Sequence, residues 1–175
     1  QFGWDVAIDD DWAIIGSRNE QNGPNGEIIP NIGTAYAFQR SSTGTWEEVQ
    51  KLFASDFTSN DQFGGAIDLD GTALILGADL EDDDPEGNNT VRGAGSAYLF
   101  ELNNNTWEEV DKVVGLNRKA NDWFGITVAL YGDQAAVGAW AADGFNGTVN
   151  DAGATYVFQR DEPILATTQR KLPKT

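Results

Sequence analysis

The strongest constraint on this chain is an internal repeat with a period of 61 residues. Phe-Gly occurs at residues 2–3, 63–64 and 124–125, so both intervals are 61 residues. A second glycine keeps the same register, at positions 16, 77 and 138. Because a fixed period of this kind indicates one supersecondary unit per repeat, we expect three tandem units within one structural domain. These units span residues 1–61, 62–122 and 123–175.

Most of each unit is predicted to consist of short strands. Short apolar runs lead into Asp9-Asp10-Asp11 and into Asp70-Gly71, which predicts hairpin turns. The next run, Trp12 to Gly16 and its counterparts, is continuously apolar, which is typical of a strand buried on both faces. A polar loop follows, and then an alternating strand, Gly33 to Phe38 and its counterparts. The paired glycines predict that backbones approach closely where strands converge.

The fourth segment of each unit is compatible with two structures. Trp46, Val49 and Leu52 follow helical spacing, and Thr45-x-x-Glu48 has the form of a capping box. A lone helix of about eight residues is marginal in water, however. A strand with a local irregularity at the Glu pair also fits, and the pattern alone leaves both open. Four short strands per unit predict an all-β fold of four-stranded antiparallel β-propeller blades, with a sandwich or barrel as the alternative.

Composition excludes much chemistry. The 175 residues include 28 acidic and 11 basic side chains, for a net charge of −17, and no His, Cys or Met. This rules out thiol and imidazole catalysis and thiolate metal sites. The charge argues against binding to nucleic acid, and no apolar run is long enough for membrane insertion. Glu47-Glu48 and its repeat are adjacent and cannot flank one glycosidic bond, so we predict no enzyme, no catalytic residue and no cofactor-binding residue.

Four landmarks in fixed order resemble the FG-GAP repeat, the blade unit of integrin α-chain propellers and of many bacterial and archaeal extracellular proteins. They are Asp61 to Gly64, the apolar run ending at Gly77-Ala78, Gly95 to Phe100 and Thr106 to Val110. The resemblance implies four-stranded blades with the Trp-Glu-Glu segment as outer strand, a role in extracellular adhesion or recognition, and calcium in some blades. The chain departs from the family in two features. It has three units, whereas propellers usually close with four to eight blades, and its third unit lacks Trp-Glu-Glu.

Three blades leave two end faces in water. Covering one face would yield on the order of 5–10 kcal/mol, against an association cost of roughly 4–15 kcal/mol. When two chains close into one ring, two such contacts form for a single association cost. This favours a homo-oligomer of 3 + 3 blades. The alternatives are a fibre, in which the C-terminal segment adds a strand to the next subunit, and a carbohydrate- or protein-binding fragment of a larger propeller. We therefore expect a secreted or cell-surface adhesion or structural module that self-associates, with an extracellular protein or glycan as a further ligand.

Several residues are candidate sites. Asp82, Asp84 and Glu86 alternate before Gly87, as in the first half of a calcium loop, although a solvated acidic loop is the alternative. Trp46 and Trp107 share one repeat position and are predicted to pack. The other tryptophans do not share one position, and exposed ones could bind partners or sugars; they are Trp4, Trp12, Trp123 and Trp140. Asn-x-Thr sequons predict glycosylation sites at Asn88, Asn104 and Asn146.

Overall fold

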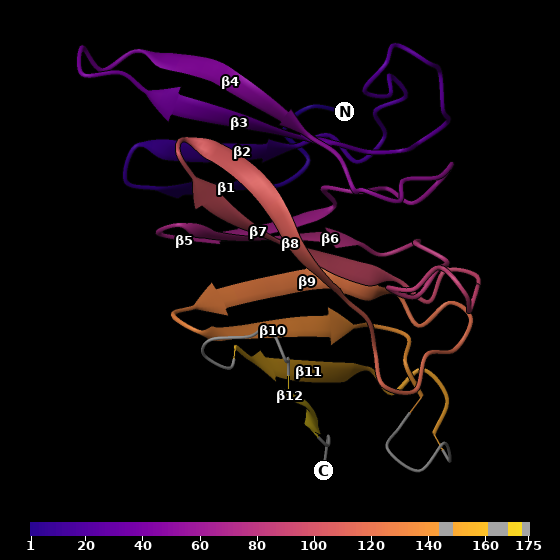
Figure 1. Ribbon diagram of the computed structural model, residues 1–175. Helices are drawn as coiled ribbons and strands as arrows, with labels where there is room; N and C mark the ends of the chain where they lie inside the picture. The colour runs from indigo at the N-terminus through magenta and orange to yellow at the C-terminus, as the bar shows by residue number, and fades with distance from the viewer. Residues whose placement is uncertain (144–148, 161–167, 173–175) are drawn as a thin grey trace.

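The chain folds into three four-stranded antiparallel sheets stacked one on the next (Figure 1). The computed structural model describes residues 1–143, 149–160 and 168–172. The elements of secondary structure within these residues are all β-strands. The predicted all-β architecture of four-stranded blades is thereby confirmed. Within the described ranges, no helix is long and apolar enough to cross a membrane.

In each sheet the strands lie in chain order, and each strand pairs antiparallel with the next. The Asp9 and Asp70 turns join the first two strands of their sheets, as predicted. The first sheet contains β1 (Val6–Asp9), β2 (Trp12–Gly16), β3 (Ala35–Arg40) and β4 (Trp46–Leu52). The second contains β5 (Ala66–Asp70), β6 (Ala73–Ala78), β7 (Ser96–Asn103) and β8 (Thr106–Val113). The third contains β9 (Phe124–Tyr131), β10 (Gln134–Ala139), β11 (Ala154–Gln159) and β12 (Thr168–Leu172).

The ambiguous fourth segment is a strand with a β-bulge. Phe38 pairs with Glu48, whereas the preceding Ala37 pairs with Gln50, so Val49 is an extra residue in β4. β8 shows the same shift in register against β7. A bulge of this kind bends and twists a strand, and it breaks the strict alternation of side chains that would have identified the segment as a strand.

The third sheet keeps its outer strand although the Trp-Glu-Glu motif is absent. β12 pairs with β11, and Tyr156 lies opposite Lys171 as Tyr36 lies opposite Lys51 in the first sheet. Ladder hydrogen bonds come from the backbone, so this pairing does not require the motif. The strand is therefore paired within its own chain, and the fibre alternative, in which it joins the next subunit, stays a prediction.

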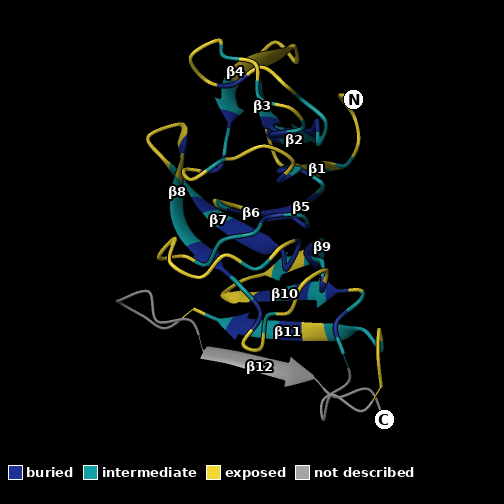
Figure 2. Ribbon diagram, turned by 90° about the vertical axis from the view of Figure 1, so that its right-hand side faces the viewer, coloured by how far each residue is buried: buried dark blue, intermediate teal, exposed yellow. Residues whose placement is uncertain are grey.

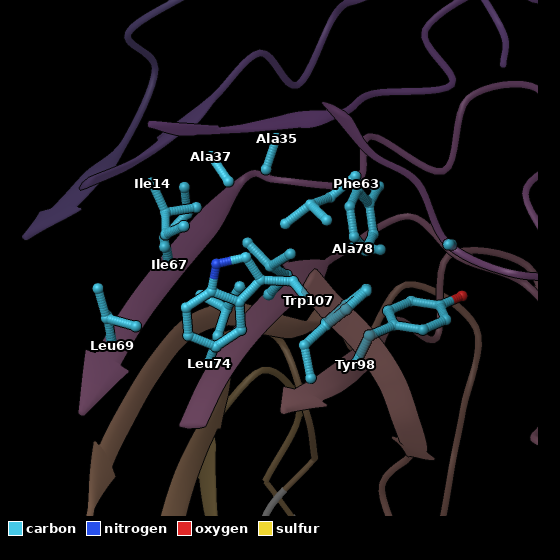
Figure 3. Packing of buried hydrophobic residues seen from close by; sticks show 14 of the residues in the cluster. Ile14, Ala35, Ala37, Phe63, Ile67, Leu69, Leu74, Ala78, Tyr98 and Trp107 are labelled. Atoms are coloured by element: carbon cyan, nitrogen blue, oxygen red, sulfur yellow. The ribbon is translucent and has the colours of Figure 1, made fainter. Parts of the chain in front are cut away.

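The core lies in two layers between the sheets. Figure 3 shows side chains of the layer between the first and second sheets, with Trp107 among them. Trp107 packs edge-on against Trp12, with ring centroids 5.5 Å apart. Figure 2 shows that the middle sheet is the most completely buried. Burial on both faces, predicted for all three apolar runs, holds for β6 only. β2 and β10 alternate because each has a neighbouring sheet on one face.

Candidate functional site

Each joint between sheets contains an aromatic triad built around the repeated Phe-Gly. In the first joint, Phe63 packs edge-on against Tyr98 and Phe100, with centroid distances of 5.4 and 6.1 Å. Edge-on pairs bring the positive ring edge to the negative face of the neighbour. The second joint repeats the arrangement at 5.3 and 6.1 Å with Phe124, Tyr156 and Phe158.

The backbone of Phe-Gly fits against glycines of the preceding sheet. Phe63 forms a parallel bridge with Gly33. A Cβ atom on Gly16 would overlap the carbonyl oxygen of Gly64, and Gly64 has a φ of +78°. Only glycine accepts both the close approach and the positive φ. The second joint is built alike by Gly77, Gly95, Phe124 and Gly125, so the predicted close approach of backbones is confirmed.

Carboxylates also link neighbouring sheets, in an arrangement that we call the carboxylate clasp. Asp5 Oδ2 accepts a 2.7 Å hydrogen bond from the N–H of Ile67, and its Oδ1 accepts one from Val6 of its own strand. In the second joint Asp68, two positions further along the repeat unit than Asp5, makes a similar pair with the N–H groups of Leu130 and Leu69. The acceptor always belongs to the earlier sheet, so the clasp has a direction.

A second clasp lies at the hairpin turns. Asp9 Oδ2 accepts from the N–H of Gly71 at 2.7 Å, and Asp70 Oδ2 accepts from Gly132 at 2.6 Å. The third sheet has Tyr131 at this strand position, and its side chain is 82% exposed. Sequence reasoning treated Asp9 only as a turn residue. The signal it missed is the recurrence of Asp 61 residues later at the same strand end.

The outer face of the first sheet carries the same aromatic triad without a neighbouring sheet. Phe2 packs edge-on against Tyr36 at 5.2 Å and against Phe38 at 6.3 Å. Phe2 is 59% exposed, however, whereas Phe63 is fully buried. This face therefore has the side chains of an internal joint, and in the described part of the chain no other sheet covers it.

The inner strand of the first sheet gives the same contrast. Val6 and Ile8 are 62% and 70% exposed. Their counterparts in the second sheet, Ile67 and Leu69, are 7% and 8% exposed because the first sheet covers them. The open face of the first sheet thus carries large apolar side chains at positions that are buried in the internal joint. We call this face the first end face.

A buried polar network lies beside the first joint. Glu81 is fully buried, 3.4 Å from Lys112 Nζ, and its Oε2 accepts a 3.2 Å hydrogen bond from the Tyr98 hydroxyl. Lys112 also pairs with Asp56 at 2.5 Å. Burial, together with the charge of Asp61, raises the pKa of Glu81 to about 7, although Lys112 acts in the opposite direction. Sequence reasoning missed this network because its members come from separate loops and strands.

A partly exposed counterpart of this network lies on the first end face. The Tyr36 hydroxyl donates to Glu20 at 3.0 Å, and Lys51 lies 5.2 Å from the Tyr36 ring. Burial alone would raise the pKa of Glu20, but backbone N–H groups of Asn22 and Gln21 and the Tyr36 hydroxyl lower it to about 2. Glu20 is therefore ionised at neutral pH and adds a negative charge beside the aromatic triad of the first end face.

Two of the three predicted calcium residues accept hydrogen bonds from backbone N–H groups of their own loop. Asp82 Oδ1 accepts from the N–H of Gly93 at 2.6 Å, and Asp84 Oδ1 accepts from the N–H of Asn88 at 2.9 Å. Glu86 is exposed, and no hydrogen bond to its carboxylate is present among the described residues. Among the described residues, no group of three or more acidic side chains is placed to hold a metal ion. Calcium at Asp82, Asp84 and Glu86 stays a prediction, which isothermal titration with calcium would test.

The remaining predicted residues fall into different surroundings. Trp107 is buried, whereas Trp46 at the same repeat position is 37% exposed. The sequon residues Asn88 and Asn104 are exposed, Asn104 in the β7–β8 turn, and Asn146 lies outside the described residues. Glycosylation at these positions stays a prediction. Among the other tryptophans, Trp12 is buried, Trp4 is 49% exposed, and Trp123 stacks on Trp140 at 5.0 Å.

Comparison with known families agrees with this geometry. The FG-GAP repeat profile matches residues 1–38, 46–100 and 107–158. The second and third matches each begin in the outer strand of one sheet and end in the third strand of the next. A comparison with curated proteins found no match. FG-GAP proteins are generally non-enzymatic and occur outside cells or on their surfaces. With three matches that together cover most of its length, the chain belongs to the FG-GAP repeat family.

Proposed function

We propose that this chain is a non-enzymatic extracellular module for adhesion or structural assembly, and that it self-associates through its end sheets. The observation that carries the proposal is the aromatic triad of Phe2, Tyr36 and Phe38 on the first end face. The same triad lies inside both internal joints, where another sheet buries it. We expect an apolar face with these side chains to bind a partner, because large exposed apolar patches mark interaction sites.

The partner of the first end face is a further β-sheet rather than a small molecule. Its strand register matches that of the second sheet, whose equivalent face packs against the first sheet. A second copy of the chain supplies such a sheet, either in a closed ring of 3 + 3 blades or in an open array. The settings in which the family occurs support secretion or surface display.

Sedimentation velocity over a wide concentration range tests this proposal. The wild-type chain is expected to show larger species as concentration rises. Ile8→Lys places a charge on the first end face and should weaken association about tenfold or more, because a buried unpaired charge is costly. The matched control is Leu116→Lys, since Leu116 is 69% exposed in a linker away from this face. A wild-type chain that stays monomeric up to millimolar concentration would contradict the proposal.

A second candidate function is carbohydrate binding at the pair of Trp123 and Trp140. Their rings stack with an interplanar angle of 15°, and Trp140 is 66% exposed. Beside them lies a hollow of about 290 Å³ that Asn121 and Asp151 help to line. Aromatic faces flanked by polar groups suit the apolar faces and hydroxyls of sugars. A glycan array with the wild type and with Trp140→Ala tests this, and no hits with the wild type would remove the candidate.

A further inference from the structure

The outer face of the third sheet contains an open hollow of about 650 Å³. We call it the Phe-Gly hollow, because its position corresponds to the places in the first two sheets that receive a Phe-Gly backbone. In the first sheet that place is formed by Gly16 and Gly33, and in the second by Gly77 and Gly95. The lining of the Phe-Gly hollow includes Thr127, Gly138, Ala139, Gly153, Ala154 and Thr155.

The third sheet retains both glycines, but no Phe-Gly backbone from the described residues fills the space. A Cβ atom on Gly138 would meet atoms of Thr127 in the same sheet, where one on Gly77 would overlap the carbonyl oxygen of Gly125. Gly153 has a φ of +75°, like Gly95 at +83°, and a Cβ there would come no closer than 3.3 Å to another residue. The third sheet therefore keeps the receiving glycines, although no described residue of another sheet packs on them.

The Phe-Gly segment that would fit this hollow, Phe2-Gly3, lies at the opposite end of the stack. Gly3 has a φ of +82° and donates a 3.0 Å hydrogen bond to the carbonyl of Gly16. Gly64 has a φ of +78° and donates at 3.0 Å to Gly77. Phe2-Gly3 thus already has the conformation of the buried Phe63-Gly64. A Cβ on Gly3 would meet nothing within 4 Å, however, whereas one on Gly64 would lie 2.5 Å from the carbonyl oxygen of Thr34.

We propose that Phe2-Gly3 of a second copy of the chain occupies the Phe-Gly hollow of the third sheet. This inference rests on the proposed self-association and names its contact. The internal joints give the register: the N–H of Phe63 donates to the carbonyl of Ile32, and that of Phe124 donates to Ala94. By the same register, Phe2 of one copy donates to Ala152 of the other. Because the two surfaces differ, the contact is head-to-tail and produces either a closed ring or an open filament.

Two variants, each blocking one half of the contact, test this inference. Phe2→Ala removes the inserted ring, and Phe2 is exposed enough for the fold to tolerate the change. Thr155→Trp fills the hollow from an exposed strand position, where an aromatic side chain is compatible with β-structure. Each variant alone should weaken association about tenfold or more. Thr43→Trp, in the exposed turn before β4, is the matched control and should associate like the wild type.

Mixing the two variants gives the decisive measurement. Phe2→Ala retains an open hollow and Thr155→Trp retains Phe2, so a head-to-tail contact predicts that the mixture forms a 1:1 heterodimer through a single contact, more tightly than either variant associates with itself. Sedimentation with one variant fluorescently labelled detects it. A mixture that associates no more than either variant alone up to millimolar concentration, or a Thr155→Trp chain that associates like the wild type, overturns this inference while self-association stands. A monomeric wild-type chain overturns the proposed function and this inference together.

A cross-link provides an independent readout, since the chain has no native cysteine. In the first joint, Gln62 and Phe63 donate to the carbonyls of Asn31 and Ile32, which places residue 62 beside residue 32. The corresponding pair between copies is Gln1 and Ala152. A Gln1→Cys, Ala152→Cys double variant should therefore form an intermolecular disulfide between these two positions on mild oxidation. Peptide mass spectrometry identifies the bond. Its absence in the associated protein, or equal yield from a Leu116→Cys, Ala152→Cys control, counts against the contact.

Discussion

The backbone N–H of Leu130 donates a 2.6 Å hydrogen bond to Oδ2 of Asp68, one sheet away and 62 residues earlier in the chain. Asp68 Oδ1 accepts at the same time from Leu69. One carboxylate therefore satisfies N–H groups on the inner strands of two neighbouring sheets. Hydrogen bonds to an ionised acceptor are the stronger kind, so these clasps contribute to holding the stack together.

Asp68→Ala should destabilise the protein by about 1–3 kcal/mol, because it leaves the Leu130 N–H without its acceptor in a partly buried joint. Chemical denaturation followed by tryptophan fluorescence measures the effect. The matched control is Asp11→Ala, which removes an exposed ion pair with Arg40. Exposed pairs contribute at most about 1 kcal/mol. Equal losses in the two variants would show that the clasp adds nothing specific.

Gly77→Ala and Gly138→Ala compare the same repeat position inside the stack and at its end. The Gly77 variant should lose about 1–3 kcal/mol or more, because the new methyl group would overlap the Gly125 carbonyl in the second joint. The Gly138 variant should lose less, since its closest neighbour is the hydroxyl of the exposed Thr127 side chain, which can rotate away. Thermal unfolding of both variants checks the order, and a reversed order contradicts the account of the joint.

Trp107→Ala should cost about 3–5 kcal/mol, as expected for truncating a fully buried aromatic side chain. Trp107 is 2% exposed and packs on Trp12. Trp46 occupies the same repeat position at 37% exposure, so Trp46→Ala should cost clearly less. Urea titration of the two variants gives both values. Similar losses would mean that the outer strand of the first sheet is more buried in solution than in this structure.

Glu81 should make stability depend on pH. Its pKa rises from 4.5 to about 7 in the folded state, so the native protein binds more protons than the unfolded chain between these values. The free energy of unfolding therefore falls as pH increases through this window. At about 1.4 kcal/mol per pKa unit, the decrease is at most about 3.5 kcal/mol.

Glu81→Gln should remove this decrease and stabilise the protein near pH 7, because an amide oxygen can still accept from the N–H groups of Asp82 and Asp83. Denaturation curves between pH 4 and pH 8 measure the slope. Glu86→Gln, in the same loop but exposed, is the control and should retain the wild-type slope. If Glu81→Gln retains it too, another group is responsible.

Much of the fold could be predicted from the repeat. The Phe-Gly and glycine landmarks identified the units, and the paired glycines correctly indicated close backbone contact at Gly16 and Gly64. The bulge at Val49 concealed β4, because an extra residue breaks the period of two. β12 lacks the Trp-Glu-Glu landmark of the other outer strands, and its pairing depends on backbone groups.

The site was harder to predict than the fold. The clasp at Asp5 joins residues 62 positions apart, and its recognition requires knowing which strand edges meet. The network around Glu81 combines two loops with two strands. The exposed triad at Phe2 was present in the sequence, but its meaning depends on which sheet lacks a neighbour. These properties arise from the stacking of sheets and not from any local pattern.

The third sheet has Tyr131 where the first two sheets have Asp9 and Asp70. A contact between copies would therefore lack the clasp that each internal joint has at this position. Under dilution or mechanical load, such an assembly should separate between subunits before any subunit opens within itself. The molecules would come apart intact and could reassemble, so the material that they form would be reversible and self-repairing.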